Sequence, residues 1–133
     1  MKKKVAILLT RNIIWATIIF VLCTMPGDRL PDPRLDIPYM DKMVHFGMFF
    51  IMALLLCNEL EYQTHWRKRR IYMIAVGVVF LYGGVIEIMQ EYWFERSGDI
   101  WDLLADVFGA IVGCLTYPYL RKLKNRIFAV KSK

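Results

Sequence analysis

The sequence predicts an all-α membrane protein, a bundle of four transmembrane helices with both termini on the cytoplasmic side. Of the 133 residues, 57% are hydrophobic, which is rare for a soluble domain of this size. The apolar residues form long runs between short charged stretches, rather than recurring at the helical period that leaves one face wet. Basic residues gather at the chain ends and in one loop, each time beside an apolar run. Together these observations indicate that lipid is the solvent of the helices.

The four spans follow from the thickness of a bilayer. Crossing the hydrocarbon core takes about 20 residues, because an α-helix rises roughly 1.5 Å per residue across about 30 Å. Four stretches are long and apolar enough, at about residues 5–24, 43–60, 71–89 and 101–120. No internal repeat, low-complexity tract or linker separates them. We therefore expect a single domain over residues 1–133.

The first span contains two polar residues, Arg11 and Asn12. Arg11 lies about 9 Å above Val5 at 1.5 Å per residue, which is within snorkelling reach of the nearer interface. A cleavable signal peptide is the alternative for this segment, but no A-x-A-like site follows it. Leu22 before Cys23 also argues against a lipoprotein cleavage site. We expect a retained helix.

Proline controls the connection between the first and second spans. Pro26, Pro31, Pro33 and Pro38 all lie in this loop, and proline disfavours helix both at its own position and at the preceding residue. The loop is therefore expected to be extended and irregular, without a further helix.

The loop charges predict the orientation, because lysine and arginine concentrate on the cytoplasmic side. The basic groups lie at residues 2–4, at residues 67–70 in the second loop, and at residues 121–133. The first and third loops mix arginine and lysine with several acids. We therefore expect the second loop and both termini inside, and the first and third loops outside.

The formal charge of +6 is explained by this orientation signal, so a nucleic acid is not expected as a partner. The three cysteines, Cys23, Cys57 and Cys114, each fall inside an apolar run. They are interpreted as small packing residues, and their spacing suggests neither a disulfide framework nor a metal site. No metal is predicted from spacing, and no cofactor is identified.

Ionisable and amide side chains collect at the outer ends of the second, third and fourth spans, where such groups are costly. Spacings of three and four place them on one face of each helix. Three helix ends thus bring polar groups to a similar depth. The predicted functional pocket consists of Asp41, Lys42, His45, Glu87, Gln90, Arg96, Asp99, Asp102 and Asp106.

Small residues lie in two of the same predicted helices. Ala105, Gly109 and Gly113 are spaced four apart in the fourth span, a pattern that permits close helix packing in lipid. Gly83 and Gly84 lie one turn below Glu87 on the third span and are predicted to allow a similar approach. The acids near these stripes should therefore face the bundle.

Structural roles would also explain single members of the pocket. Asp41 and Asp99 stand where helix N-caps are expected. Glu87 would act as a buried strut if it paired with Lys42 or Arg96, and His45 would be an interfacial histidine. The convergence of three helices on one patch favours a functional site over these separate roles.

Three ordered motifs resemble the signature of VanZ-like membrane proteins, and a Met-Pro-Gly after the first span also fits that family. The resemblance covers nearly the whole chain, from the first span to Leu120. One departure is Asp106, where many members carry asparagine. The motifs are DKMVHFG at residues 41–47, GGVIEIMQ at residues 83–90, and R-x-x-D-x-x-D-x-x-x-D-x-x-G-x-x-x-G at residues 96–113.

This resemblance implies a multi-pass protein of the bacterial cytoplasmic membrane, in a family named for low-level resistance to the glycopeptide antibiotic teicoplanin. It implies no particular reaction. A housekeeping role at the cell envelope is equally compatible with it.

Three functions are compatible with these features. The first is a binding module whose outward-facing pocket engages a polar or lipid-linked envelope ligand or a glycopeptide, with membrane lipids as surroundings. The second is an intramembrane enzyme acting on a lipid-linked substrate, with Glu87 or His45 as general base and Asp102 and Asp106 holding Mg²⁺. No catalytic triad or zinc spacing supports this second function. The third is a structural assembly protein in which the polar cluster joins helices. Ligand, oligomeric state and partner proteins are left open.

Overall fold

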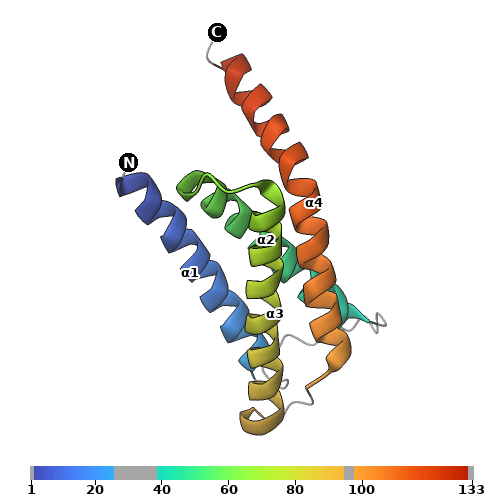
Figure 1. The fold of residues 1–133 in the computed structure, drawn as a ribbon. Helices are drawn as coiled ribbons and strands as arrows, with labels where there is room; N and C mark the ends of the chain where they lie inside the picture. The colour runs from blue at the N-terminus through green and yellow to red at the C-terminus, as the bar shows by residue number, and fades with distance from the viewer. Residues whose placement is uncertain (1, 26–38, 95–97, 132–133) are drawn as a thin grey trace.

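A computed structural model describes residues 2–25, 39–94 and 98–131, and the side chains of residues 5–25, 39–94 and 98–127. Within these ranges the chain forms four α-helices and no strand (Figure 1). They are α1 (Lys2–Thr24), α2 (Met40–Gln63), α3 (Lys68–Trp93) and α4 (Ile100–Lys131). All four are long and apolar enough to cross a membrane. The predicted all-helical class with four spans is confirmed.

The helices are longer than the predicted spans. α2 begins at Met40 rather than residue 43, and α4 continues eleven residues beyond Leu120 to Lys131. The predicted bounds marked only the apolar part of each helix. Lysine and arginine are good helix formers, so the basic segment after Leu120 extends the same helix out of the apolar region.

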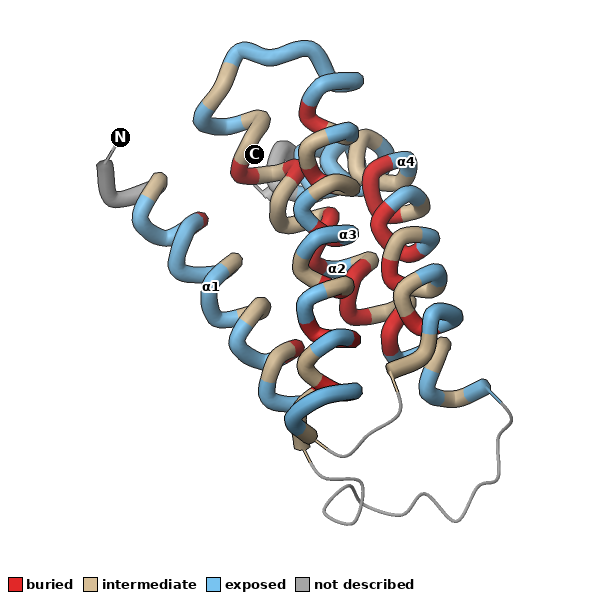
Figure 2. The backbone as a smooth tube through the Cα atoms, turned by 60° about the horizontal axis from the view of Figure 1, so that its bottom comes forward, coloured by how far each residue is buried: buried red, intermediate tan, exposed pale blue. Residues whose placement is uncertain are grey.

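The helices run alternately up and down, so the N- and C-termini lie at the same end of the molecule (Figure 1). α2 and α4 share the most extensive interface, and α3 packs against both. α1 contacts α2 and α3 and leaves most of its surface exposed (Figure 2). Most of its outward residues are apolar, as with Ile13 and Ile14, although Arg11 is exposed as well. Such a surface is compatible with contact with lipid tails.

Glycine sets how closely α2 and α4 approach. A Cβ on Gly113 would lie 2.7 Å from the carbonyl oxygen of Phe50, and one on Gly109 would overlap the carbonyl of Phe46. Gly83 likewise faces α4, where a Cβ would lie 2.6 Å from Asp106 Oδ2. Gly84, predicted to act with Gly83, has no such neighbour within 4 Å. Because adjacent helical residues point about 100° apart, only one of the two faces α4.

Hydrogen bonds between described residues hold α1 to the other helices. The Trp15 indole donates to the carbonyl of Met48 at 2.9 Å, and the Tyr82 hydroxyl donates to the carbonyl of Ala16 at 2.6 Å. The Gln90 amide donates to the carbonyl of Cys23 at 2.7 Å. A fourth bond joins Asn12 to Glu59. These bonds fix the position of a helix whose buried surface is small.

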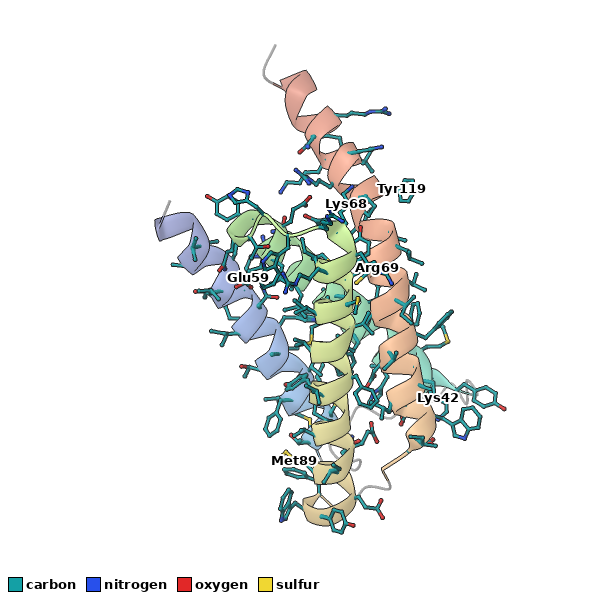
Figure 3. The ribbon with its side chains drawn as sticks, in the orientation of Figure 1. Lys42, Glu59, Lys68, Arg69, Met89 and Tyr119 are labelled. Atoms are coloured by element: carbon teal, nitrogen blue, oxygen red, sulfur yellow. The ribbon has the colours of Figure 1, made fainter. Side chains whose placement is uncertain are left out.

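The orientation in the membrane gives a first testable prediction. Lys68 and Arg69 lie at the end of the bundle opposite Lys42 (Figure 3), and Tyr39 is exposed near the Lys42 end. The loop around Asp32, also predicted to be outside, lies beyond the described residues. With the three native cysteines replaced, Tyr39→Cys is expected to react with an impermeant maleimide added to intact cells. Lys68→Cys is expected to react only after the cells are opened. The opposite labelling would reverse the orientation.

Candidate functional site

Lys42 connects α2 to the start of α4 at the predicted outer end. Its Nζ lies 2.7 Å from Asp99 Oδ2 and 3.0 Å from Asp102 Oδ1. Asp99 also accepts a bond from the Trp101 N–H at 2.9 Å, as an N-cap does. The Lys42 ammonium, and then this N–H, hold the pKa of Asp99 below its usual range. Asp99 thus both caps a helix and bridges two helices.

Asp41 does not take the capping role that its position suggested. It lies in the first turn of α2, whose N-cap is Tyr39 with φ 64° and no capping side chain. The Asp41 carboxylate instead lies close to His45 and Asp102, with one ligand atom of each within 4.8 Å of the others. Asp41 therefore belongs to the rim of the polar cluster.

His45 and Asp106 form the buried centre of the cluster. His45 Nδ1 lies 3.0 Å from Asp106 Oδ1, and both side chains are at most 3% exposed. The ring of Phe49 stacks beside His45. Because Gly83 has no side chain, α3 approaches Asp106 closely on its other side. The pair therefore lies between α2, α3 and α4.

Glu87 extends the cluster to α3. Its Oε2 accepts a bond from the backbone N–H of Asp99 at 2.9 Å, so it helps hold the start of α4. Its Oε1 is buried without a hydrogen-bond partner among the described residues, and so is Asp106 Oδ2. Glu87, His45 and Asp106 each offer one ligand atom within 4.8 Å of the others. Buried carboxylate oxygens are normally paired, so these two oxygens require an explanation.

One predicted member does not join the cluster in the structure, and another is not described. Gln90 is buried, but its amide bonds to α1 at Cys23, so it acts between α3 and α1. Arg96 lies outside the described residues. The alternative in which Glu87 pairs with Lys42 as a strut is not observed, because Lys42 binds Asp99 and Asp102. Glu87 is therefore not a charge-paired strut among the described side chains.

An apolar groove adjoins the cluster. It has a volume of about 640 Å³ and lies between α3 and the start of α4. Its walls include Phe80, Leu81, Ile88 and Leu103, and Glu87 also lines it. Glu87 therefore lies at the boundary between the polar cluster and a groove suited to hydrocarbon.

A second polar group lies in the half of the bundle near the termini and was not predicted. Asn12 donates to Glu59, which also accepts a bond from Gln63 at 2.8 Å. Glu59 is labelled in Figure 3, far from Lys42. Asn12 lies seven residues into the first span, and Glu59 lies near the end of the second. In an antiparallel pair of helices these two positions lie at a similar depth. This similarity in depth could have predicted the contact between Asn12 and Glu59 from the sequence.

Comparison with known proteins gives two matches. The family model described as VanZ/LLP1 matches residues 5–121. An uncharacterized protein of the fission yeast Schizosaccharomyces pombe is 27% identical over 84 residues, which are 62% of this chain and 49% of that protein. The chain thus spans about half the length of this curated relative. No solved structure matches the chain.

Proposed function

The chain belongs to the VanZ/LLP1 family, and from this membership and the site geometry we propose that it binds an amphiphilic ligand of the cell envelope. The polar head of the ligand enters the cluster around His45, Glu87 and Asp106. Its apolar part lies in the groove between α3 and α4. A lipid-linked envelope precursor and the glycopeptide teicoplanin are the two ligands of this kind that the family resemblance suggests.

The position of Glu87 is the observation that carries this proposal. Its side chain lines the apolar groove and also belongs to the buried group with His45 and Asp106. Ligand sites typically combine apolar walls with a few convergent polar groups. A molecule with a hydrocarbon part and a polar head would satisfy both surfaces at one place.

The charges of the cluster favour a cationic or hydroxyl-rich head. Among the described side chains, carboxyl groups outnumber the single ammonium group of Lys42, which already binds Asp99 and Asp102. An added anion would meet uncompensated acids, whereas hydroxyl or ammonium donors would find free acceptors at Glu87 and Asp106. The proposal therefore includes the charge of the polar head, which is positive or neutral.

The location in the cell is part of the same proposal. The resemblance supports a bacterial cytoplasmic membrane with the pocket facing outward, while the relative reported above comes from fission yeast. The loop charges support the outward direction. The labelling experiment above tests the direction independently of any ligand.

Chemistry on a lipid-linked substrate is the second candidate function. It is favoured by Glu87, which lines the groove and whose Oε1 is buried without a hydrogen-bond partner among the described residues. A general base needs such a free oxygen within reach of the substrate proton. In this case Glu87 would take the proton and His45 would stabilise or relay it. Turnover of a bound ligand, rather than simple binding, would distinguish this function.

The proposed function predicts that Glu87→Gln binds teicoplanin at least tenfold more weakly, because the amide removes an acceptor from the groove wall. Binding of fluorescently labelled teicoplanin to the purified protein in detergent is the measurement. Tolerance of a bacterial host expressing equal amounts of each variant is the second measurement. Glu61→Gln makes the same change at the opposite end of the bundle and should bind like the parent.

Two results would count against the proposal. Equal binding by Glu87→Gln and the parent would show that this carboxylate does not contribute to ligand binding. Loss of folded protein in Glu87→Gln, judged by thermal unfolding in detergent, would show that Glu87 mainly holds the α3–α4 junction through its bond to Asp99.

A further inference from the structure

We propose that His45, Glu87 and Asp106 form a binding site for one first-row divalent metal ion. The proposal deepens the proposed function, because the ion would lie in the same cluster that receives the polar head of the ligand. It concerns the inner group of three residues, not the rim group of Asp41, His45 and Asp102.

The unpaired oxygens point to a missing positive partner. Glu87 Oε1 and Asp106 Oδ2 are both buried without a hydrogen-bond partner among the described residues. Asp106 is fully buried, and Glu87 is about nine-tenths buried. Leaving buried carboxylate oxygens without a partner is costly. A cation bound between them would remove that cost at both oxygens together.

The ligand set has the right chemistry and nearly the right size. One imidazole nitrogen and two carboxylate oxygens lie within 4.8 Å of one another. Ligand atoms around a first-row divalent ion lie about 3 Å apart, since each is about 2.0–2.2 Å from the metal. Side-chain rotations that move these ligand atoms by about an ångström or two would therefore close the set around an ion. The groups come from three helices, so the ion would also hold the helices together.

The surrounding residues support the site without filling it. Glu87 Oε2 already accepts a hydrogen bond from the Asp99 N–H, and Asp106 Oδ1 lies 3.0 Å from His45 Nδ1, a contact within the ligand set itself. These contacts orient each carboxylate and leave the second oxygen free. A supporting hydrogen bond such as that from Asp99 is typical around metal ligands. Gly83 contributes by leaving space for Asp106 Oδ2, which a Cβ would meet at 2.6 Å.

The charge balance also requires a cation. Lys42 is the basic group that contacts the cluster in the described part of the chain, and it binds Asp99 and Asp102 at the rim. It therefore leaves Glu87 and Asp106 without a lysine or arginine partner among the described residues, and His45, which lies beside Asp106, carries a charge only when it is protonated. A divalent ion would balance these two carboxylates. Because the groups are buried in a membrane segment, uncompensated charge there is expensive.

The donor set selects among metals. An imidazole with two carboxylates suits Mn²⁺, Fe²⁺, Co²⁺ or Zn²⁺ better than Mg²⁺ or Ca²⁺, which prefer oxygen ligands alone. With three protein ligands, one or more positions on the ion remain open. A hydroxyl of a ligand head entering from the groove would occupy such a position. This is how the ion would connect the cluster with the proposed ligand.

The test uses untagged, purified protein in detergent, stripped with a chelator and titrated with Mn²⁺, Zn²⁺ or Mg²⁺ alone. We expect one ion per chain, with Zn²⁺ and Mn²⁺ bound at least tenfold more tightly than Mg²⁺. Glu87→Gln and Asp106→Asn should each weaken binding at least tenfold. Asp41→Asn, the matched change at the rim, should bind within twofold of the parent.

A spectroscopic measurement supplements the variants in case one of them does not fold. Electron paramagnetic resonance of the unmodified protein with Cu²⁺ should show coupling to one imidazole nitrogen. The chain has two histidines, so His65→Asn should keep this signal and His45→Asn should lose it. Absence of bound ion in the folded parent would overturn the proposal. Binding that depends on Asp41 but not on Glu87 would also overturn it.

The outcomes separate this inference from the proposed function. A bound ion without any teicoplanin binding would contradict the proposed ligand and keep the metal site. Teicoplanin binding that is unchanged by complete removal of metal, in protein that takes up no ion, would contradict the metal site and keep the proposed function.

Discussion

Gly109→Leu is expected to destabilise the protein by about 3 kcal/mol, the upper part of the range for overpacking a tight interface. At Gly109 even a Cβ would lie 3.2 Å from the Cα of Phe46 and would overlap its carbonyl oxygen. The obstacle is backbone, which cannot rotate away as a side chain can. Leucine would therefore force α2 and α4 apart. The midpoint of thermal unfolding in detergent should fall by roughly 10 °C.

Gly47→Leu is the matched control for this prediction. It makes the same substitution on α2, where a Cβ would have no neighbour within 4 Å. Both changes add the same side chain and improve helix propensity equally, so the difference between them isolates the contact with Phe46. A Gly109→Leu protein as stable as Gly47→Leu would mean that this face of α4 does not pack on α2.

Oxidation of Cys57 and Cys114 is expected to form a disulfide that joins α2 to α4. The two sulfurs lie 3.5 Å apart, and both side chains are buried. A membrane-permeant oxidant such as iodine would accept the two electrons and become two iodide ions, and the two thiol protons would pass to water. The bond would close a loop of 57 residues, and the chain-entropy model gives about 4 kcal/mol of added stability for such a loop.

Non-reducing electrophoresis, peptide mass spectrometry and thermal unfolding before and after reduction check this prediction. Cys23→Ser removes the remaining cysteine and should leave the cross-link intact. Cys57→Ala should prevent it and leave the oxidant without effect on the unfolding midpoint. Cross-links that form only between molecules would show that α2 and α4 are in a different register.

Much of the fold was predictable because lipid restricts what a chain can do. A segment in hydrocarbon must satisfy its own backbone, so long apolar runs become helices. The four spans follow from this rule, with Arg11 accommodated on the exposed face of α1. The ends of the helices were less predictable, because hydropathy marks where lipid ends and not where the helix ends. This is why α4 extends past Leu120 to Lys131.

The faces of the helices were predictable from spacing, with instructive errors. The positions of Asp102, Asp106, Gly109 and Gly113 follow one stripe, and all four are buried. The same reasoning paired Gly83 with Gly84, although neighbouring residues on a helix point in different directions. It also placed Gln90 in the pocket with Glu87. In the structure Gln90 points towards α1. Three residues along a helix turn a side chain by about 60° relative to a full turn, which is enough for Gln90 to face a different helix from Glu87.

The sequence by itself determined that lipid surrounds the helices, that there are four of them, and which face of each is polar. These features depend on composition and on the helical period. Tertiary structure alone decided which polar groups meet. It joined His45 to Asp106, Lys42 to Asp99 and Asn12 to Glu59, and it left one oxygen of Glu87 and one of Asp106 without a partner. Helical spacing specifies directions around one axis. The crossing angle and vertical register of two helices come from side-chain packing between distant segments, and a shift of one turn would exchange every one of these partners.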